Sequence, residues 1–261
     1  MKTVTSVSGG QSSAYIAANY PADFLVFALV CIEDRNCTPK DKGLVNEVSD
    51  RIGHEFIATA EDDTILHTIL DLEQYLGQRI HWVTGKSFDH LRKAGLPNIM
   101  WRYCTELMKI KPMHKWWKET IGEPVKMQIG FRAGEEKRAA RMLDACDSNG
   151  LRAYGKTPWQ KPVFPMIDDG IRRDQVVEFW RGNFVRFAPQ NNCVGCFHRN
   201  PLVLRKMFDL HPKKMAWFQD MEKRKGAQWK SQMSYADIAK HRPQAEIDFD
   251  EWGCDSGHCG L

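Results

Sequence analysis

Three of the eight cysteines have a spacing that indicates metal or sulfur chemistry. Cys193 and Cys196 form a Cys-x-x-Cys turn, which places two sulfurs on one side of a tight loop and suits zinc or an iron–sulfur cluster. Cys104 follows Arg102 closely and stands near an expected helix start, so we expect a lowered thiol pKa and a capacity to bind metal. The competing interpretation of Cys104 is a small buried apolar side chain.

A glycine-rich turn near the N-terminus has the composition of a phosphate-binding loop. It follows residues 2–7, which have strand character, and precedes residues 14–18, which have helix character. A helix N-terminus offers unpaired amides, glycines let the backbone approach phosphate oxygens, and serine hydroxyls add donors. The competing interpretation is an ordinary turn with a serine cap. The predicted nucleotide-binding residues are Ser8, Gly9, Gly10, Gln11, Ser12 and Ser13.

Strands that alternate with helices predict an α/β fold with a doubly wound, mostly parallel sheet that positions these residues. The apolar run 24–32 is typical of a strand buried on both faces, and residues 40–52 predict an amphipathic helix that ends at Gly53. The final part of the chain predicts helices alone. The other predicted elements are strands at 54–58 and 125–131, an extended segment at 164–168, and helices at 63–76, 105–121, 173–181, 201–210 and 212–225.

Composition and charge narrow the class of protein. The 261 residues are 43% hydrophobic and 27% charged, which is typical of a globular protein with a sizeable core. The net charge of +4 permits an anionic substrate without requiring nucleic acid. The sequence shows neither a run of about 18 apolar residues nor the apolar core of a signal peptide. We therefore expect a cytoplasmic protein, in which cysteines serve as ligands or redox groups.

The order of these motifs resembles a known family. The turn at 8–13 resembles the SGGxxS loop of the PP-loop, or N-type ATP pyrophosphatase, superfamily. Together with the Arg-x-Cys-Thr segment at 102–105, the segments at 129–138 and 165–168, and the Cys-x-x-Cys turn, the chain resembles the phosphoadenosine phosphosulfate (PAPS) reductase family, including DndC-like and phage-encoded members. The resemblance covers roughly residues 3–210.

The resemblance implies a fold, a domain division and a ligand. The fold is an adenine nucleotide alpha-hydrolase-like α/β fold with a five-stranded sheet and a helical C-terminal extension. A PP-loop nucleotide-binding domain would span residues 1–190, and residues 191–261 would form a Cys-x-x-Cys helical region with a flexible tail. The ligand is ATP or a sulfonucleotide such as PAPS. Many loops of the superfamily have lysine and aspartate where Gln11 and Ser12 stand, so Mg²⁺ or other basic residues would supply the missing charge.

Basic residues around the strand at 125–131 are the expected anion-binding groups, because arginine pairs bidentately with phosphate or sulfate oxygens. By resemblance, Arg102 and Arg138 are predicted to bind the nucleotide, and Arg132 and Lys109 to act in catalysis. Asp34, just past the second predicted strand, is a weaker candidate for contact with ribose or adenine, since turns commonly carry acids.

The resemblance also implies a metal centre, since clustered members of the family carry four cysteines. Cys104, Cys193 and Cys196 correspond to three of them and would hold a [4Fe–4S] cluster with one open iron, as sulfur transfer requires. Alternatively, His198 or Cys146 completes four ligands for zinc. We favour iron–sulfur, because Cys-x-x-Cys-x-His is cramped for a usual zinc finger. A purely structural knuckle is the competing interpretation.

The C-terminal Cys259-Gly260-Leu261 is similar to the mobile segment that carries the catalytic thiol of family reductases. By this resemblance Cys259 would attack the sulfur of a sulfonucleotide, and an external thiol of the thioredoxin kind would then release sulfite. The competing interpretation is a chain end whose thiols have no role.

Three functional hypotheses follow. The leading one is an enzyme that adenylates an acceptor with ATP, releases pyrophosphate and transfers sulfur through the cluster. The alternative is a PAPS or adenosine phosphosulfate reductase that uses Cys259, and a different class is a non-catalytic nucleotide- or metal-binding regulatory module, which Gln11 and Ser12 suit. The expected partners are an adenine nucleotide and a sulfur donor or reductant, without a membrane; a homodimer stays open. A basic run with tryptophans at 213–229 makes nucleic acid a less favoured partner.

Overall fold

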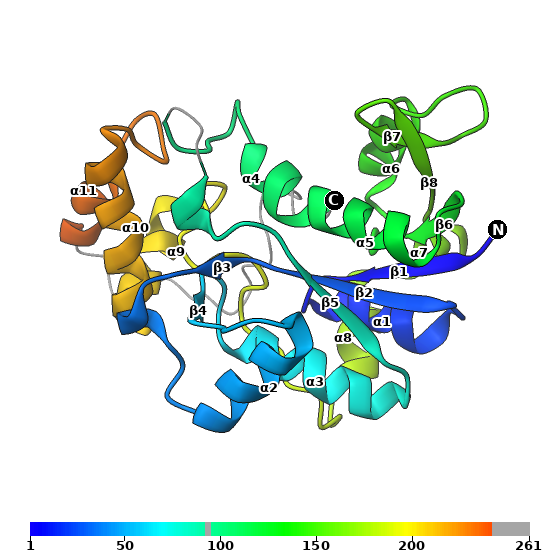
Figure 1. Cartoon of the computed structure of the whole chain (residues 1–261), viewed down its shortest axis with the longest axis horizontal. Coiled ribbons are helices and arrows are strands. Elements are labelled where there is room, and N and C mark those ends of the chain that lie inside the picture. The colour runs from blue at the N-terminus through cyan, green and yellow to red at the C-terminus, as the bar shows by residue number, and fades with distance from the viewer. Residues whose placement is uncertain (92–94, 242–261) are drawn as a thin grey trace.

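The central sheet of the computed structural model, which describes residues 1–91 and 95–241, contains six strands in the order β5-β2-β1-β6-β8-β7 (Figure 1). Neighbouring strands are parallel except β7 and β8, which form an antiparallel hairpin at the edge. The predicted α/β fold with a mostly parallel sheet is confirmed, with one strand more than the five expected. The strands are β1 (Thr3–Val7), β2 (Phe24–Leu29), β5 (Ile80–Thr84), β6 (Val125–Gln128), β7 (Arg152–Tyr154) and β8 (Thr157–Val163).

Several segments differ from the sequence prediction, which also gave no strands at the positions of β7 and β8. The strand expected at 54–58 is β4 (Ala58–Thr59), which pairs antiparallel with β3 (Cys31–Ile32) outside the main sheet. The strand β5 was not predicted, because its five residues include the polar His81 and form a strand by pairing with β2. The segment expected to be extended at 164–168 is the short helix α7 (Pro165–Asp168), since a proline at the first helical position favours a helix start.

The helices begin and end close to the predicted positions. In α2, the side chain of Asp41 accepts a hydrogen bond from the Leu44 amide, and Gly53 ends the helix at φ +75°, a conformation that favours glycine. Among the described residues, no helix has the length and apolar character needed to cross a lipid bilayer. Besides α7, the α-helices of the described residues are α1 (Gln11–Asn19), α2 (Lys42–Ile52), α3 (Thr64–Leu76), α4 (Tyr103–Thr105), α5 (Lys111–Thr120), α6 (Glu136–Leu143), α8 (Arg173–Trp180), α9 (Pro201–Leu210), α10 (Pro212–Lys225) and α11 (Tyr235–Lys240).

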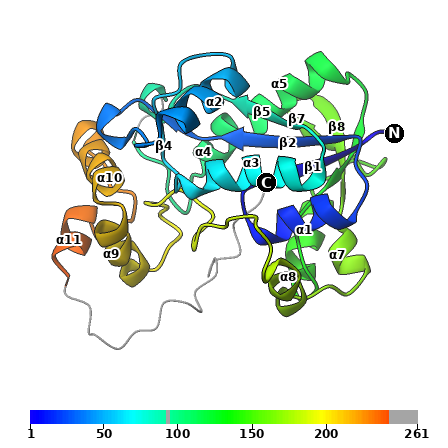
Figure 2. The ribbon, with the colours of Figure 1, turned by 90° about the horizontal axis from the view of Figure 1, so that it is seen from below.

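Helices cover both faces of the sheet (Figure 2). One buried cluster joins apolar residues of β1, β2 and β5 to α1, α2, α3 and α8, and a second joins the opposite face to α5 and α6. The described residues also contain three short helical turns that are not α-helical: η1 (Arg35–Cys37), η2 (Phe88–His90) and the π-helical turn η3 (Glu106–Ile110). This layering is that of a doubly wound fold, as the sequence predicted.

The helices α9, α10 and α11 lie beyond the carboxyl ends of the central strands (Figures 1 and 2). Their apolar residues, with Trp217 and Trp229 at the centre, share one buried cluster with Val30, Ile32 and Phe88. The C-terminal helices therefore pack directly on the N-terminal half of the chain. The boundary that we placed after residue 190 stays a prediction.

Candidate functional site

The carboxyl ends of β1 and β6 border a pocket of about 670 Å³. The sheet extends from β1 towards β5 on one side, and from β6 towards β7 on the other. Open α/β sheets bind ligands at such a reversal of strand order, where the loops diverge. Gly130, after β6, lies so close to α1 that a Cβ atom there would be 3.2 Å from the Ser13 amide nitrogen. The pocket therefore begins where two strand ends meet the N-terminus of α1.

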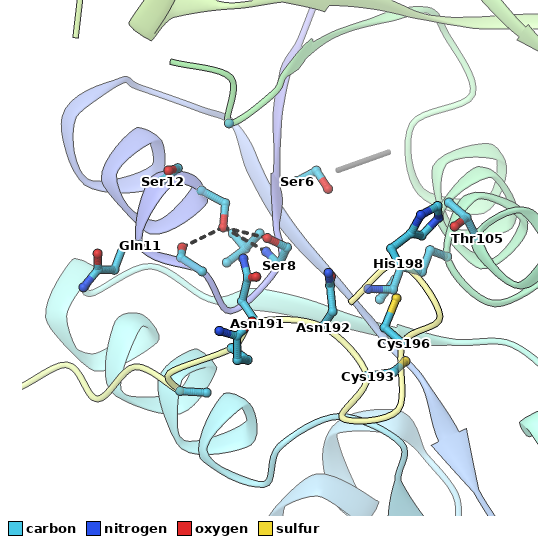
Figure 3. Close-up of a pocket in the computed structure, with 18 of the residues that line it drawn as sticks. Ser6, Ser8, Gln11, Ser12, Thr105, Asn191, Asn192, Cys193, Cys196 and His198 are labelled. Carbon is cyan, nitrogen blue, oxygen red and sulfur yellow. Dashed lines mark hydrogen bonds between the residues drawn. The ribbon is translucent and has the colours of Figure 1, made fainter. Parts of the chain in front are cut away.

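Residues 8–13 form one end of this pocket, here named the glycine-loop end (Figure 3). The oxygen Oγ of Ser13 accepts a hydrogen bond from the Ser8 amide at 3.0 Å and donates one to the Gly10 carbonyl at 3.0 Å. Gly9 has φ +74°, and a Cβ atom there would be 2.5 Å from Ile65 Cγ2, so only glycine fits. Gly9 shapes the turn, and the other five predicted loop residues line the pocket.

The first turn of α1 is suited to bind an anion. Gly10 occupies the cap position and provides no side-chain acceptor for the helix amides. Uncapped amides and the positive end of the helix dipole attract phosphate oxygens. A Cβ atom on Gly10 would overlap the side-chain amide of Asn191, which lies directly against the loop. Glycine is therefore required here so that a later segment of the chain can approach.

Two arginines and a shared carboxylate line the pocket after β6. Glu135 Oε2 accepts hydrogen bonds from the amide and Nε of Arg132 at 2.9 and 3.2 Å, and its Oε1 pairs with Arg138 Nη1. The guanidinium of Arg138 lies 4.2 Å from the centroid of the Phe131 ring. Burial would raise the Glu135 pKa, but the Arg132 amide and both arginine charges hold this pKa below its ordinary value. The ionised carboxylate thus fixes both predicted anion-binding arginines at the pocket wall.

Lys109 lies in the π-helical turn η3, a geometry common at functional sites. Its Nζ is 3.0 Å from Oε1 of Glu61, a carboxylate only 1% exposed. Burial opposes the charge of the ammonium group, yet the Glu61 carboxylate beside it raises the Lys109 pKa. The other Glu61 oxygen, Oε2, is buried without a hydrogen-bond partner among the described residues. Lys109 is therefore a charged group anchored at the pocket, as predicted for a residue that meets an anion.

The Cys-x-x-Cys turn is held by its backbone. The amide of Cys196 donates to the Cys193 carbonyl at 3.0 Å, and Cys193 forms an antiparallel bridge with Glu61. Arg199 is 7% exposed and donates from Nε and Nη2 to the Cys193 carbonyl at 3.3 and 3.1 Å. Its Nη2 also donates to the Asn192 carbonyl at 3.1 Å. A buried arginine thus adds hydrogen bonds to two carbonyl groups of the turn.

The C-terminal helices support the same turn from behind. The Tyr235 hydroxyl donates to the Gly195 carbonyl at 2.8 Å, and Lys230 Nζ donates to the Phe197 carbonyl at 2.7 Å. A Cβ atom on Gly195 would overlap the buried ring of Phe218 in α10. The turn therefore has its shape because residues 40 positions downstream pack against it.

Cys193 and Cys196 lie at the other side of the pocket (Figure 3), and Cys104 lines the pocket with them; this side is here named the thiol end. Each pair of these thiols interacts electrostatically. Burial, with the Glu61 carboxylate, raises the Cys193 pKa well above its ordinary value. Burial, with Cys196, also raises the Cys104 pKa; Arg102 acts to lower it but does not prevail, so our expectation of a lowered thiol pKa is wrong. Desolvation outweighs the nearby charge, and these two sulfurs are neutral thiols at pH 7.

The donor set has the chemistry of a metal site but not its geometry. His198 lines the pocket with the three cysteines. Within residues 1–91 and 95–241, however, no three His, Cys, Asp or Glu side chains form a group that could hold a metal ion. Cys146 donates its Sγ to the Met142 carbonyl at 3.5 Å and is not among the residues that line the pocket. The side chains as arranged do not fit a cluster, and the iron–sulfur and zinc assignments stay predictions.

Asp34 is a predicted site residue that the structure does not bring to the pocket. Asp34 Oδ1 accepts from the Asn36 amide at 2.9 Å, caps η1 and does not line the pocket. Cys259 lies outside the described residues. Arg102 does line the pocket, beside Cys104 and Thr105, as the sequence predicted.

The basic run on α10, considered as a nucleic-acid surface, is largely engaged within the protein. Lys214 is buried and its Nζ is 2.7 Å from Asp63 Oδ1. Lys225 donates to the Leu91 carbonyl at 3.2 Å. The two positive charges therefore stabilise the packing of α10 on the rest of the chain.

Sequence reasoning missed several residues that the structure places at the site. Asn191 and Asn192 lie between the serines and the sulfurs (Figure 3). The sequence did contain a signal for these two residues, because the polar pair immediately precedes the Cys-x-x-Cys turn. Glu61 had a weaker signal, an acidic run just after a predicted strand. Arg173 had none, because a single arginine at a helix start is common on protein surfaces.

In comparisons with known proteins, no family model, no curated protein and no solved structure matches the chain. The assignment of a function therefore rests on the site. The pocket combines an uncapped helix N-terminus, three predicted basic residues with fixed carboxylate partners, and three thiols. Such an arrangement can bind a polyphosphate at one end and present sulfur to it from the other.

Proposed function

We propose that the protein is a nucleotide-dependent sulfur-transfer enzyme of the PP-loop kind, which binds ATP in this pocket and activates an acceptor by adenylation. The observation that carries the proposal is that residues 8–13, the arginines after β6, and Cys104, Cys193 and Cys196 all line one pocket of about 670 Å³. A pocket of this size suits a nucleotide. The three groups come from distant parts of the chain, and no single packing requirement explains their meeting.

In the proposed reaction, an acceptor oxygen attacks the α-phosphorus of ATP and the bond to pyrophosphate breaks. The amides at the start of α1, with Arg132 and Arg138, bind the negative charge that develops on the phosphate oxygens. Lys109 adds a further point charge at the pocket. A sulfur nucleophile of the persulfide or sulfide class then attacks the acceptor carbon, and AMP leaves with the oxygen.

The thiols have a separate part in this scheme. Cys104 and Cys193 are partly buried and protonated at rest, so they line the pocket as neutral thiols. The predicted cluster stays a prediction, and the proposal assigns no step to it. Iron, sulfide and zinc contents of anaerobically purified protein test that predicted cofactor directly.

The test is ATP binding by titration calorimetry on anaerobic protein, with AMP and pyrophosphate measured in the same samples. Arg138→Gln should weaken ATP binding about tenfold, because a charge-assisted hydrogen bond to phosphate is lost. Arg141→Gln on the same helix is the matched control, since its side chain is exposed and does not line the pocket. Failure of the wild-type protein to bind ATP would reject the proposal. ATP binding without AMP would indicate the regulatory module, and sulfite from PAPS the reductase.

A further inference from the structure

The glycine-loop end lacks a basic side chain of its own. Residues 8–13 offer amides and hydroxyls, and the position at the start of α1 is the neutral Gln11. A nucleoside triphosphate brings several negative charges to this loop. Amides and hydroxyls alone bind such charge more weakly than guanidinium groups do. The cation that meets the terminal phosphates must therefore come from another segment.

Five basic side chains line the pocket, and they differ in their partners. Lys109 is paired with Glu61, and Arg132 and Arg138 share Glu135. Within residues 1–91 and 95–241, the side chain of Arg173 forms neither an ion pair nor a hydrogen bond. Its charge is thus not offset by a carboxylate of the described chain. The full set is Arg102, Lys109, Arg132, Arg138 and Arg173.

The fold fixes Arg173 relative to the loop. Arg173 begins α8, which packs on α1, where Trp180 Nε1 donates to the Gln11 carbonyl at 3.1 Å. At the other end of α8, the Ala133 amide donates to the Ile171 carbonyl at 2.9 Å and ties the start of the helix to the segment after β6. Arg173 therefore stands on a helix anchored at both ends to the phosphate-binding elements.

The direction of the ligand follows from the two ends of the pocket. In both views α8 lies against α1 and away from α9, α10 and α11, which support the thiol turn (Figures 1 and 2). If sulfur chemistry occurs near the thiols, the α-phosphate faces them and the leaving pyrophosphate points towards α8. This placement rests on the proposed function.

We propose that Arg173 supplies the cation missing at Gln11 and binds the terminal phosphates of a nucleoside triphosphate. The side chain is exposed at the pocket edge, so it is free to reach the ligand without breaking an internal contact. Arg173 is a specificity-determining residue in this view: it favours nucleotides with β- and γ-phosphates over nucleoside monophosphates.

The experiment is titration calorimetry of the full chain with ATP and, separately, with AMP. Arg173→Gln should weaken ATP binding about five- to thirtyfold and change AMP binding less than about twofold. Arg181→Gln is the control, because Arg181 lies on the turn directly after α8 but is exposed, paired with Glu178 and absent from the pocket. The double variant Gln11→Lys/Arg173→Gln moves the charge back into the loop and should regain most of the ATP affinity.

The outcomes separate this inference from the proposed function. Equal ATP affinity of wild type and Arg173→Gln overturns the role of Arg173 while leaving nucleotide binding intact. An equal loss for ATP and AMP also overturns it, since the side chain would then act on the whole site. A wild-type protein that binds neither nucleotide overturns both. A loss of affinity for ATP but not for AMP, with recovery of ATP affinity in the double variant, supports the proposal that Arg173 supplies the charge missing at Gln11.

Discussion

The two ends of the pocket are built in opposite ways. The glycine-loop end is local: one strand, one turn and one helix contiguous in sequence, closed by Ser13 on Ser8 and Gly10. The thiol end is assembled from segments that begin near residues 61, 104 and 193 and are supported by α9 to α11. The loop depends on backbone conformation, with Ile65 and Asn191 packed against it, whereas the thiols depend on long-range packing alone. A change at the thiol end should therefore disturb the thiols more than the loop.

The largest effect is expected from Arg199→Met. This change removes the guanidinium hydrogen bonds to the carbonyls of Asn192 and Cys193 in a buried turn, so we expect the free energy of unfolding to fall by about 3–4 kcal/mol. Urea unfolding gives the value. The exposed Arg181→Met, which loses only a surface pair with Glu178, should cost less than about 0.5 kcal/mol. A loss below about 1 kcal/mol for Arg199→Met would show that the turn supports itself.

Gly9→Ala tests the local end. A Cβ atom there meets Ile65 Cγ2 at 2.5 Å in a left-handed backbone conformation, so we expect about 2–3 kcal/mol of destabilisation. ATP affinity of the folded protein should fall with it, because the turn that presents the amides is displaced. Gly155→Ala, at φ +60° with open space around it, separates backbone strain from the clash. If both variants lose the same stability, the contact with Ile65 has no part in shaping the loop.

Acid should weaken the thiol end through Asp62, next to Glu61. Burial raises the Asp62 pKa, but the hydrogen bonds from His211 and the Thr64 amide prevail and lower it to about 2. A folded-state pKa below the unfolded value stabilises the protein above about pH 4, and that stabilisation, about 2 kcal/mol, is lost as the pH falls towards 2. Unfolding measured between pH 7 and 2.5 should show this loss in the wild type.

Asp62→Asn should lose less unfolding free energy than the wild type as the pH falls from 7 to 2.5, because the titrating group is removed. The exposed Asp209→Asn should keep the wild-type profile. If Asp62→Asn loses as much unfolding free energy at low pH as the wild type, other carboxylates cause the acid sensitivity.

The smallest effect is expected from Glu135→Gln, which keeps the shape of the side chain but removes the charge that holds Arg132 and Arg138. ATP affinity should fall about three- to fivefold, with stability changed by about 1 kcal/mol or less. Calorimetric titration checks the affinity, and Glu136→Gln, fully exposed and one residue away, is the control. Tighter ATP binding would instead show that the carboxylate competes with the ligand for the arginines.

The sequence predicted most of the helices and the parallel sheet because these elements depend on local pattern. Gly53 at a helix end and the prolines that start α9 and α10 mark boundaries that hold in any tertiary context. The strands β5, β7 and β8 and the helix α7 were missed, since each strand needs its neighbour in the sheet and the helix is a single turn. The raised Cys104 pKa was also beyond the sequence, because burial cannot be read from a neighbouring arginine.

By itself, the sequence determined the glycine turn, the elements on either side of it and the identity of the thiols. Backbone preferences and hydrophobic periodicity act over a few residues, so they can be recognised in the sequence without knowledge of the fold. Only the tertiary structure decided that Cys104 and Cys193 meet, that Glu61 and Glu135 fix the basic groups, and that Arg173 faces the pocket. Those relations depend on burial and on contacts between residues tens of positions apart, which are fixed only when the layers pack.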